Sequence, residues 1–205
     1  MRRLLLIIAV SLLFFPLAAM AQTVPSEVES AARNGLKSFL DRIPAGERPN
    51  YGFTANDALD QAYLGDPFRL NMIAPEALLA YKAGDPVAPL LTETDMWYFP
   101  VMIQDRIRCV LIVDHLDGAW QAVSLGQAAL AKSLGEVRQR WPGALGYSPV
   151  LVAVFQARKY LVMVPEEAEG TLTSLSPGQT GLAGGSAANI LETLKPDVRE
   201  ALKQR

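Results

Sequence analysis

Residues 97–123 read WYFPVMIQDRIRCVLIVDHLDGAWQAV, and this stretch decides the fold. Its alternating side chains predict three strands, separated by one polar connection and one Asp-Gly hairpin turn. The predicted strands are Trp97 to Gln104, Ile107 to His115 and Trp120 to Val123, and the turns fall at Gln104-Asp105-Arg106 and Asp117-Gly118. Because consecutive strands joined by tight turns pair antiparallel, we expect a β-meander.

Helix and strand patterns continue on both sides of this meander. Apolar residues at helical spacing follow capping-box patterns at Ser26 and at Ser124-x-x-Gln127. The expected helices cover residues 27–42 and the segment from this second box to Trp141, with shorter ones after Thr54 and Pro75, and further strands cover 68–73, 150–155, 160–164 and 171–175. The strand at 150–155 is apolar on both sides, which is typical of a sheet covered on both faces. We therefore predict an α+β fold, an antiparallel β-meander sheet with helices packed against it.

The first 21 residues have the pattern of a secretory signal peptide. Arg2 and Arg3 precede an apolar run over residues 4–17, and the small-residue site Ala19-Met20-Ala21 follows. Since the apolar run is shorter than the roughly 20 residues of a bilayer-spanning helix, we expect cleavage between Ala21 and Gln22 and no stable membrane anchor afterwards. The mature protein is predicted to be exported, either to a periplasm or out of the cell.

Composition divides the rest of the chain into three parts. We expect one α+β domain over residues 22–175, a Gly, Ser and Pro linker over 176–186, and an amphipathic helical tail over 187–205. The apolar stripe of the tail consists of Ile190, Leu191, Leu194, Val198 and Leu202. Because a proline inside a helix costs about 3 kcal/mol, Pro196 predicts two short helices that meet near Lys195.

Charge and cysteine content exclude several classes of protein. The signal segment holds two of the 19 Lys and Arg and none of the 21 Asp and Glu, so 17 basic and 21 acidic residues leave a mature net charge of about −4. The basic residues are scattered among acidic ones, which argues against a nucleic-acid partner. Cys109 is the only cysteine, so no internal disulfide is possible, and its place in an alternating strand predicts a buried thiol.

The usual catalytic sets are missing from the sequence. His115 is the only histidine, and it lies six positions after Cys109 on the same predicted strand. At roughly 3.3 Å per residue the two side chains would lie about 20 Å apart, too far for a nucleophile and its base. No second histidine or cysteine completes a zinc site. We therefore predict no catalytic residue, no metal ligand and no cofactor, which favours a protein that is not an enzyme.

Three functions remain open. The first is a non-catalytic exported module that binds a protein or peptide of the cell envelope, in an accessory, inhibitory or assembly role. Its candidate contact residues are the tail residues Leu191, Leu194, Val198 and Leu202 and the strand residues Trp97 and Trp120. The second is a small-molecule binding protein or hydrolase with a pocket between sheet and helices. The third is a homodimeric structural protein.

Overall fold

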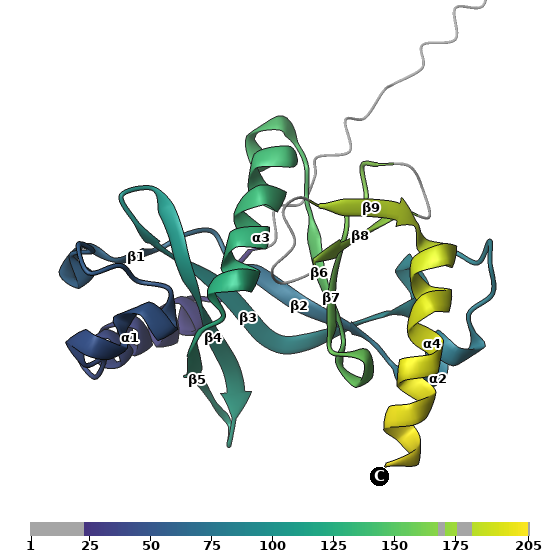
Figure 1. Cartoon of the computed structure of the whole chain (residues 1–205), viewed down its shortest axis with the longest axis horizontal. Coiled ribbons are helices and arrows are strands. Elements are labelled where there is room, and N and C mark those ends of the chain that lie inside the picture. The colour runs from purple at the N-terminus through teal and green to yellow at the C-terminus, as the bar shows by residue number, and fades with distance from the viewer. Residues whose placement is uncertain (1–22, 168–170, 176–181, 205) are drawn as a thin grey trace, which may run out of the picture.

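A computed structural model describes residues 23–167, 171–175 and 182–204, which form a mixed α/β structure around one nine-stranded sheet (Figure 1). The strands are β1 (Tyr63–Leu64), β2 (Phe68–Ile73), β3 (Leu91–Ile103), β4 (Arg106–Leu116), β5 (Ala119–Gly126), β6 (Val150–Val154), β7 (Lys159–Met163), β8 (Thr171–Leu175) and β9 (Ala183–Ser186). The helices are α1 (Ser26–Leu40), α2 (Pro75–Ala80), α3 (Ala128–Arg140) and α4 (Ala187–Lys203). The strand order is β5-β4-β3-β2-β6-β7-β8-β9, with β1 beside β3.

The predicted meander is confirmed in strands β3, β4 and β5. Both of its connections are two-residue turns whose residues have positive φ, at Gln104 and Asp105 and again at Asp117 and Gly118. Positive φ at both central positions matches the twist of the flanking strands. The strands are longer than their sequence pattern indicates, and β3 begins at Leu91 rather than at Trp97.

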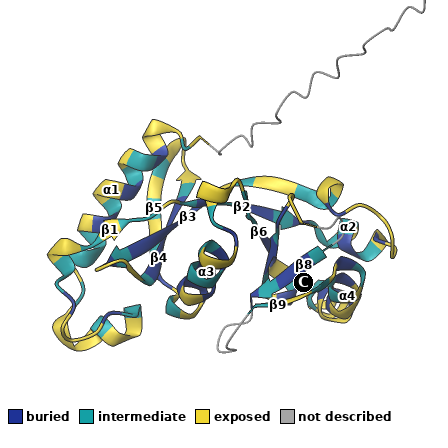
Figure 2. Cartoon of the chain, turned by 90° about the horizontal axis from the view of Figure 1, so that it is seen from above, coloured by how far each residue is buried: buried dark blue, intermediate teal, exposed yellow. Residues whose placement is uncertain are grey.

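Helices cover both faces of the sheet, as the apolar strands predicted. On one face α3 packs against β3, β4, β6 and β7, where Tyr98 and Leu151 are almost fully buried. On the other face α1 packs against β3 to β5, and α2 with α4 packs against β6 to β8. The helices α1 and α4 lie at opposite ends of the molecule, with α3 between them (Figure 1). Figure 2 shows the buried residues gathered along the strands and the exposed ones on the outer sides of the helices.

The sheet is mixed rather than purely antiparallel, which corrects the prediction. β2 and β6 pair parallel, with Leu70 opposite Leu151. The helix α3 lies between β5 and β6 in the chain and crosses one face of the sheet, so β6 arrives beside β2 in the same direction. This single parallel pair joins the β3–β5 meander to the β6–β9 meander as one sheet.

Several local predictions at helix ends are wrong. Neither capping box forms: Pro25 precedes α1 and Gln127, in the left-handed conformation, precedes α3, and neither side chain makes a capping hydrogen bond. Ser124 lies in β5 because pairing with Ile112 of β4 extends that strand. The segment after Thr54 contains only the short 3-10 turn Leu59–Gln61.

The end of the predicted linker and the tail that follows it differ most from their predictions. Residues 183–186 form the strand β9 against β8, and α4 continues through Pro196 as one helix. Leu191 and Leu194 before the proline and Val198 after it are buried in one cluster with β6 to β8. Burial of both halves against the same surface offsets the cost of the proline. The signal peptide and residues 176–181 of the linker lie outside the described residues.

Lys195 fastens α4 to α2. Its Nζ donates to the Tyr81 carbonyl at 2.7 Å and contacts the Glu192 carboxylate at 2.5 Å, and only 9% of its side chain is exposed. We expect Lys195→Met to lower the free energy of unfolding by about 1.5 kcal/mol, because the Tyr81 carbonyl loses a charged donor. Urea unfolding measures this loss. Lys203→Met is the matched control, since the Lys203 and Glu200 side chains are 74% and 60% exposed, and it should change stability by less than about 0.5 kcal/mol. Equal losses in both variants would contradict the role of Lys195.

Candidate functional site

A cleft of about 930 Å³ lies between α1, the turn Ala45–Tyr51 and β1. We call it the α1 cleft. Its apolar lining includes Leu36, Leu40, Ile43, Leu64 and Phe99, and its charged lining includes Lys37, Asp41, Arg48, Asp60 and Asp66. Ligand pockets combine an apolar lining with a few polar groups in this way, and the volume is within their usual range.

A buried ion pair holds one wall of this cleft to the sheet. Arg108 of β4 contacts Asp57 at 2.6 Å, and only 16% and 4% of the two side chains are exposed. The Thr54 amide donates to the other Asp57 carboxylate oxygen at 2.6 Å. Burial raises the pKa of Asp57, but the Thr54 hydrogen bonds and the Arg108 charge outweigh burial and hold that pKa below its ordinary value. The loop between α1 and β1 is therefore anchored at Asp57.

The strand β1 has a free backbone edge along the cleft. It pairs with β3, where Leu64 faces Val101, and no other described strand pairs with it. The Gly65 amide donates to the Pro100 carbonyl at 2.8 Å, which is a hydrogen-bonded position of the ladder. Such positions alternate along an antiparallel pair, so the N–H and C=O of Leu64 point away from β3. Strand β1 thus offers one donor and one acceptor to a further strand.

Two cations of the cleft are not paired within the described residues. The side chains of Lys37 and Arg48 make no ion pair or hydrogen bond there, and the Arg48 Nε is buried. Tyr63 also lines the cleft, and its hydroxyl donates to the Asp105 carboxylate, which raises the pKa of Tyr63. The cleft therefore presents positive groups near acidic ones, beside an apolar floor.

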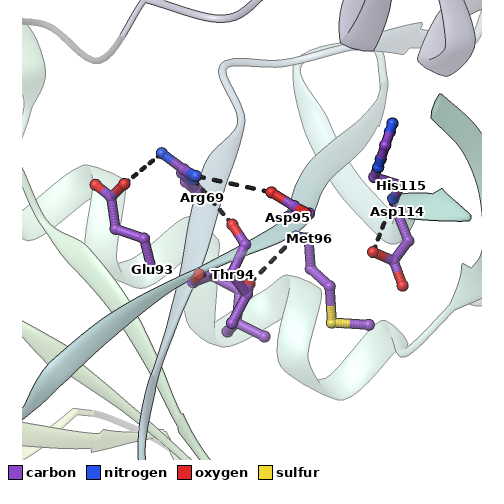
Figure 3. Close-up of polar contacts among 8 residues, drawn as sticks. Arg69, Glu93, Thr94, Asp95, Met96, Asp114 and His115 are labelled. Atoms are coloured by element: carbon purple, nitrogen blue, oxygen red, sulfur yellow. Dashed lines mark hydrogen bonds and ion pairs between the residues drawn. The ribbon is translucent and has the colours of Figure 1, made fainter. Parts of the chain in front are cut away.

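A second polar group of residues surrounds a bulge in β3 (Figure 3). The Thr94 hydroxyl donates to the Leu70 carbonyl at 2.7 Å and accepts from the Met96 amide at 3.1 Å, so it replaces a lost ladder contact. The Arg69 guanidinium contacts Glu93 at 2.6 Å and reaches Asp95 at 4.0 Å. Bulges of this kind redirect side chains, and this one brings both carboxylates to one guanidinium.

Four of the six residues that we predicted for partner contact lie in the protein's own core, and the other two, Trp120 and Leu202, are half-buried at its edge. Leu191, Leu194 and Val198 are at most 6% exposed, and Leu202 packs at the edge of the same cluster. Trp97 is 3% exposed and belongs to a different cluster, between α1 and strands β3 to β5. Trp120 packs against this second cluster, and the centre of its ring lies 4.9 Å from that of the His115 ring. None of these six residues lines the α1 cleft. The tail stripe is therefore not free to bind a partner in this structure.

Cys109 is fully buried, as predicted, and burial raises the pKa of its thiol to about 12. His115 is exposed at the end of β4, where its backbone amide donates to the Asp114 carboxylate (Figure 3). The structure does not bring either residue to the α1 cleft. Within the described ranges, no group of three or more His, Cys, Asp and Glu is placed to hold a metal ion.

Comparison with known proteins gives no family. The chain matches no protein-family model, and no curated protein or solved structure matches it. In the part of the chain that the structure describes, no helix is long and apolar enough to cross a membrane. The sites themselves are therefore the basis for assigning a function.

Proposed function

We propose that this protein is an exported, non-catalytic module that binds an extended peptide segment of a partner protein in the α1 cleft. The free edge of β1 carries this proposal. A peptide in the extended conformation would pair with the N–H and C=O of Leu64 and add a strand beside β1. The signal-peptide pattern of residues 1–21 supports a partner outside the cytoplasm.

The lining of the cleft supports a peptide in two further ways. Its apolar floor, which includes Leu36 and Phe99, suits apolar side chains of the added strand. Its unpaired cations Lys37 and Arg48 suit acidic side chains or a carboxyl terminus. Among the described residues, the lining contains no histidine, cysteine, serine or threonine, so no Ser-His or Cys-His pair forms there.

A small amphipathic molecule is the second candidate ligand. The cleft volume of about 930 Å³ favours it, because drug-sized ligands occupy pockets of similar size. Such a ligand would contact the apolar floor but would leave the strand edge of β1 without a partner.

A photo-crosslinking experiment tests the proposal and separates the two ligands. The full chain, with its own N-terminal segment, is expressed in intact cells with Tyr63→p-benzoyl-phenylalanine, and the matched control carries Phe155→p-benzoyl-phenylalanine. Both native aromatic residues are similarly exposed, at 44% and 45%, and only Tyr63 lines the cleft. We expect the Tyr63 position to form an adduct with one segment of one protein, identified by mass spectrometry after digestion.

The pattern of adducts decides between the outcomes. Adding Lys37→Glu and Arg48→Glu to the Tyr63 variant should reduce its adduct, because both changes reverse charges inside the cleft. The same protein adducts from the Tyr63 and Phe155 positions would contradict a specific cleft. A small molecule as the only specific adduct at Tyr63 would replace the peptide with the second candidate.

A further inference from the structure

A second cavity, of about 890 Å³, lies between β2, the start of β3 and the segment that leads into β6. It shares only Asp66 and Pro67 with the α1 cleft. Asn71 is one of the residues that line this cavity, and only 8% of its surface is exposed. Its side chain makes no hydrogen bond to any described residue. Neither amide atom of Asn71 is among the fully buried atoms without a partner, so both reach the solvent of the cavity, where a ligand can replace the water that pairs with them.

The surroundings of Asn71 define what could pair with it. Glu93 lies directly opposite Asn71 in the β2–β3 ladder and also lines the cavity. Arg69 donates to Oε2 of Glu93, which leaves Oε1 as a further acceptor (Figure 3). The half-buried side chains of Leu91 and Val150 add apolar surface to the same cavity. The site therefore combines an amide, a carboxylate oxygen and an apolar wall.

We infer that this cavity binds one extended residue of a peptide-like ligand through the Asn71 amide. An asparagine side chain presents an acceptor and donors side by side. One extended peptide residue presents its own N–H and C=O toward the same edge, so both partners match. The ligand N–H donates to Asn71 Oδ1, its C=O accepts from Asn71 Nδ2, and its apolar side chain packs against Leu91 and Val150. This inference does not depend on the α1 cleft or on the function proposed for it.

N-acetyl-leucine N-methylamide is the probe, because it contains one such residue with an apolar side chain. The protein is purified in its exported form, labelled isotopically and titrated with the probe while NMR spectra are recorded. We expect the side-chain NH₂ resonances of Asn71 to shift and to saturate. Asn71→Ala should weaken binding of the probe roughly tenfold, because two hydrogen bonds are lost. Thr92→Ala is the control: Thr92 neighbours Glu93 in β3, pairs with Met72 and does not line the cavity, so probe affinity should be unchanged.

Thermal unfolding of Asn71→Leu without the probe separates a binding role from a structural one. Because leucine has a similar shape and no polar group to leave unpaired, the midpoint should stay the same or rise. A fall of several degrees would show that the amide already has a structural partner and would overturn the inference. Unmoved Asn71 resonances, or equal probe affinity in the wild type and Asn71→Ala, would overturn it as well. The crosslinking experiment at Tyr63 concerns the α1 cleft, so either proposal can be contradicted while the other stands.

Discussion

Arg108→Met is expected to lower the free energy of unfolding by about 3 kcal/mol. The substitution leaves the Asp57 carboxylate, of which 4% is exposed, without its cation. A buried charge that loses its partner retains the desolvation cost of burial and loses the compensating attraction. The loop that forms one wall of the α1 cleft should become more mobile at the same time, because Asp57 also accepts the hydrogen bond of the Thr54 amide. Urea unfolding gives the energy, and hydrogen exchange of the Thr54 amide gives the local effect.

The double variant Asp57→Leu with Arg108→Met is the control for this pair. Replacing both charges with apolar side chains is often close to neutral, so it should recover most of the loss. The pair also predicts a pH dependence. The pKa of Asp57 in the folded state lies below its value in the unfolded chain, about 3.9, so the pair stabilises the protein above that pH. This contribution disappears as the pH falls through the folded pKa, and the double variant should lack it. A double variant as unstable as Arg108→Met would contradict this account.

Local sequence patterns predicted the parts of the fold that depend on local chemistry. The Asp117-Gly118 turn and the alternating strands beside it identified the meander of β3 to β5, though not the full length of its strands, because turn type and strand period depend on adjacent residues. The α1 and α3 segments were found for the same reason, since their buried residues recur at helical spacing. The burial of Cys109 also followed from its neighbours in the strand.

Long-range pairing was outside the reach of these patterns. The parallel pairing of β2 with β6 joins residues about eighty positions apart in the chain, such as Leu70 and Leu151. Pro100 argues against a central strand, yet it lies in β3 between β1 and β4. Its ring nitrogen faces the Gly65 side of the ladder, where the Gly65 amide donates to its carbonyl and no proline N–H is required. The sequence carries no local signal for this arrangement.

The candidate sites were missed for the same physical reason. The α1 cleft combines α1 with β1, and neither element is distinctive alone. Asp57 and Arg108 are 51 positions apart, so their pairing depends on the path of the loop across β4. The tail stripe was identified correctly as an apolar helical face, but the pattern does not say which surface covers it. A polar residue between two apolar ones in a strand, as Asn71 is between Leu70 and Met72, is the one signal that could have indicated a second site.

Gly35→Ala is expected to destabilise the protein by about 2 kcal/mol, although the same change stabilises most helices. Gly35 lies in the middle of α1, where its helix propensity is poor. A Cβ atom built on Gly35 would lie 2.1 Å from the Cβ of Ala122 in β5, far closer than two carbon atoms can approach. The helix must therefore move away from the sheet. Because α1 forms one wall of the α1 cleft, the displacement should also reduce the Tyr63 adduct.

A double variant isolates this contact. Ala122 Cβ is the only atom nearer than 3.5 Å to the added Cβ, so Ala122→Gly removes the clash. Gly35→Ala with Ala122→Gly should therefore be more stable than the sum of the two single changes predicts, by roughly 2 kcal/mol of coupling energy. Ala122→Gly alone is expected to cost less than about 1 kcal/mol, as glycine does in a strand interior. Thermal and urea unfolding of the four proteins in this cycle measure the coupling. Additive changes, or a more stable Gly35→Ala variant, would mean that α1 does not approach β5 closely enough to require glycine.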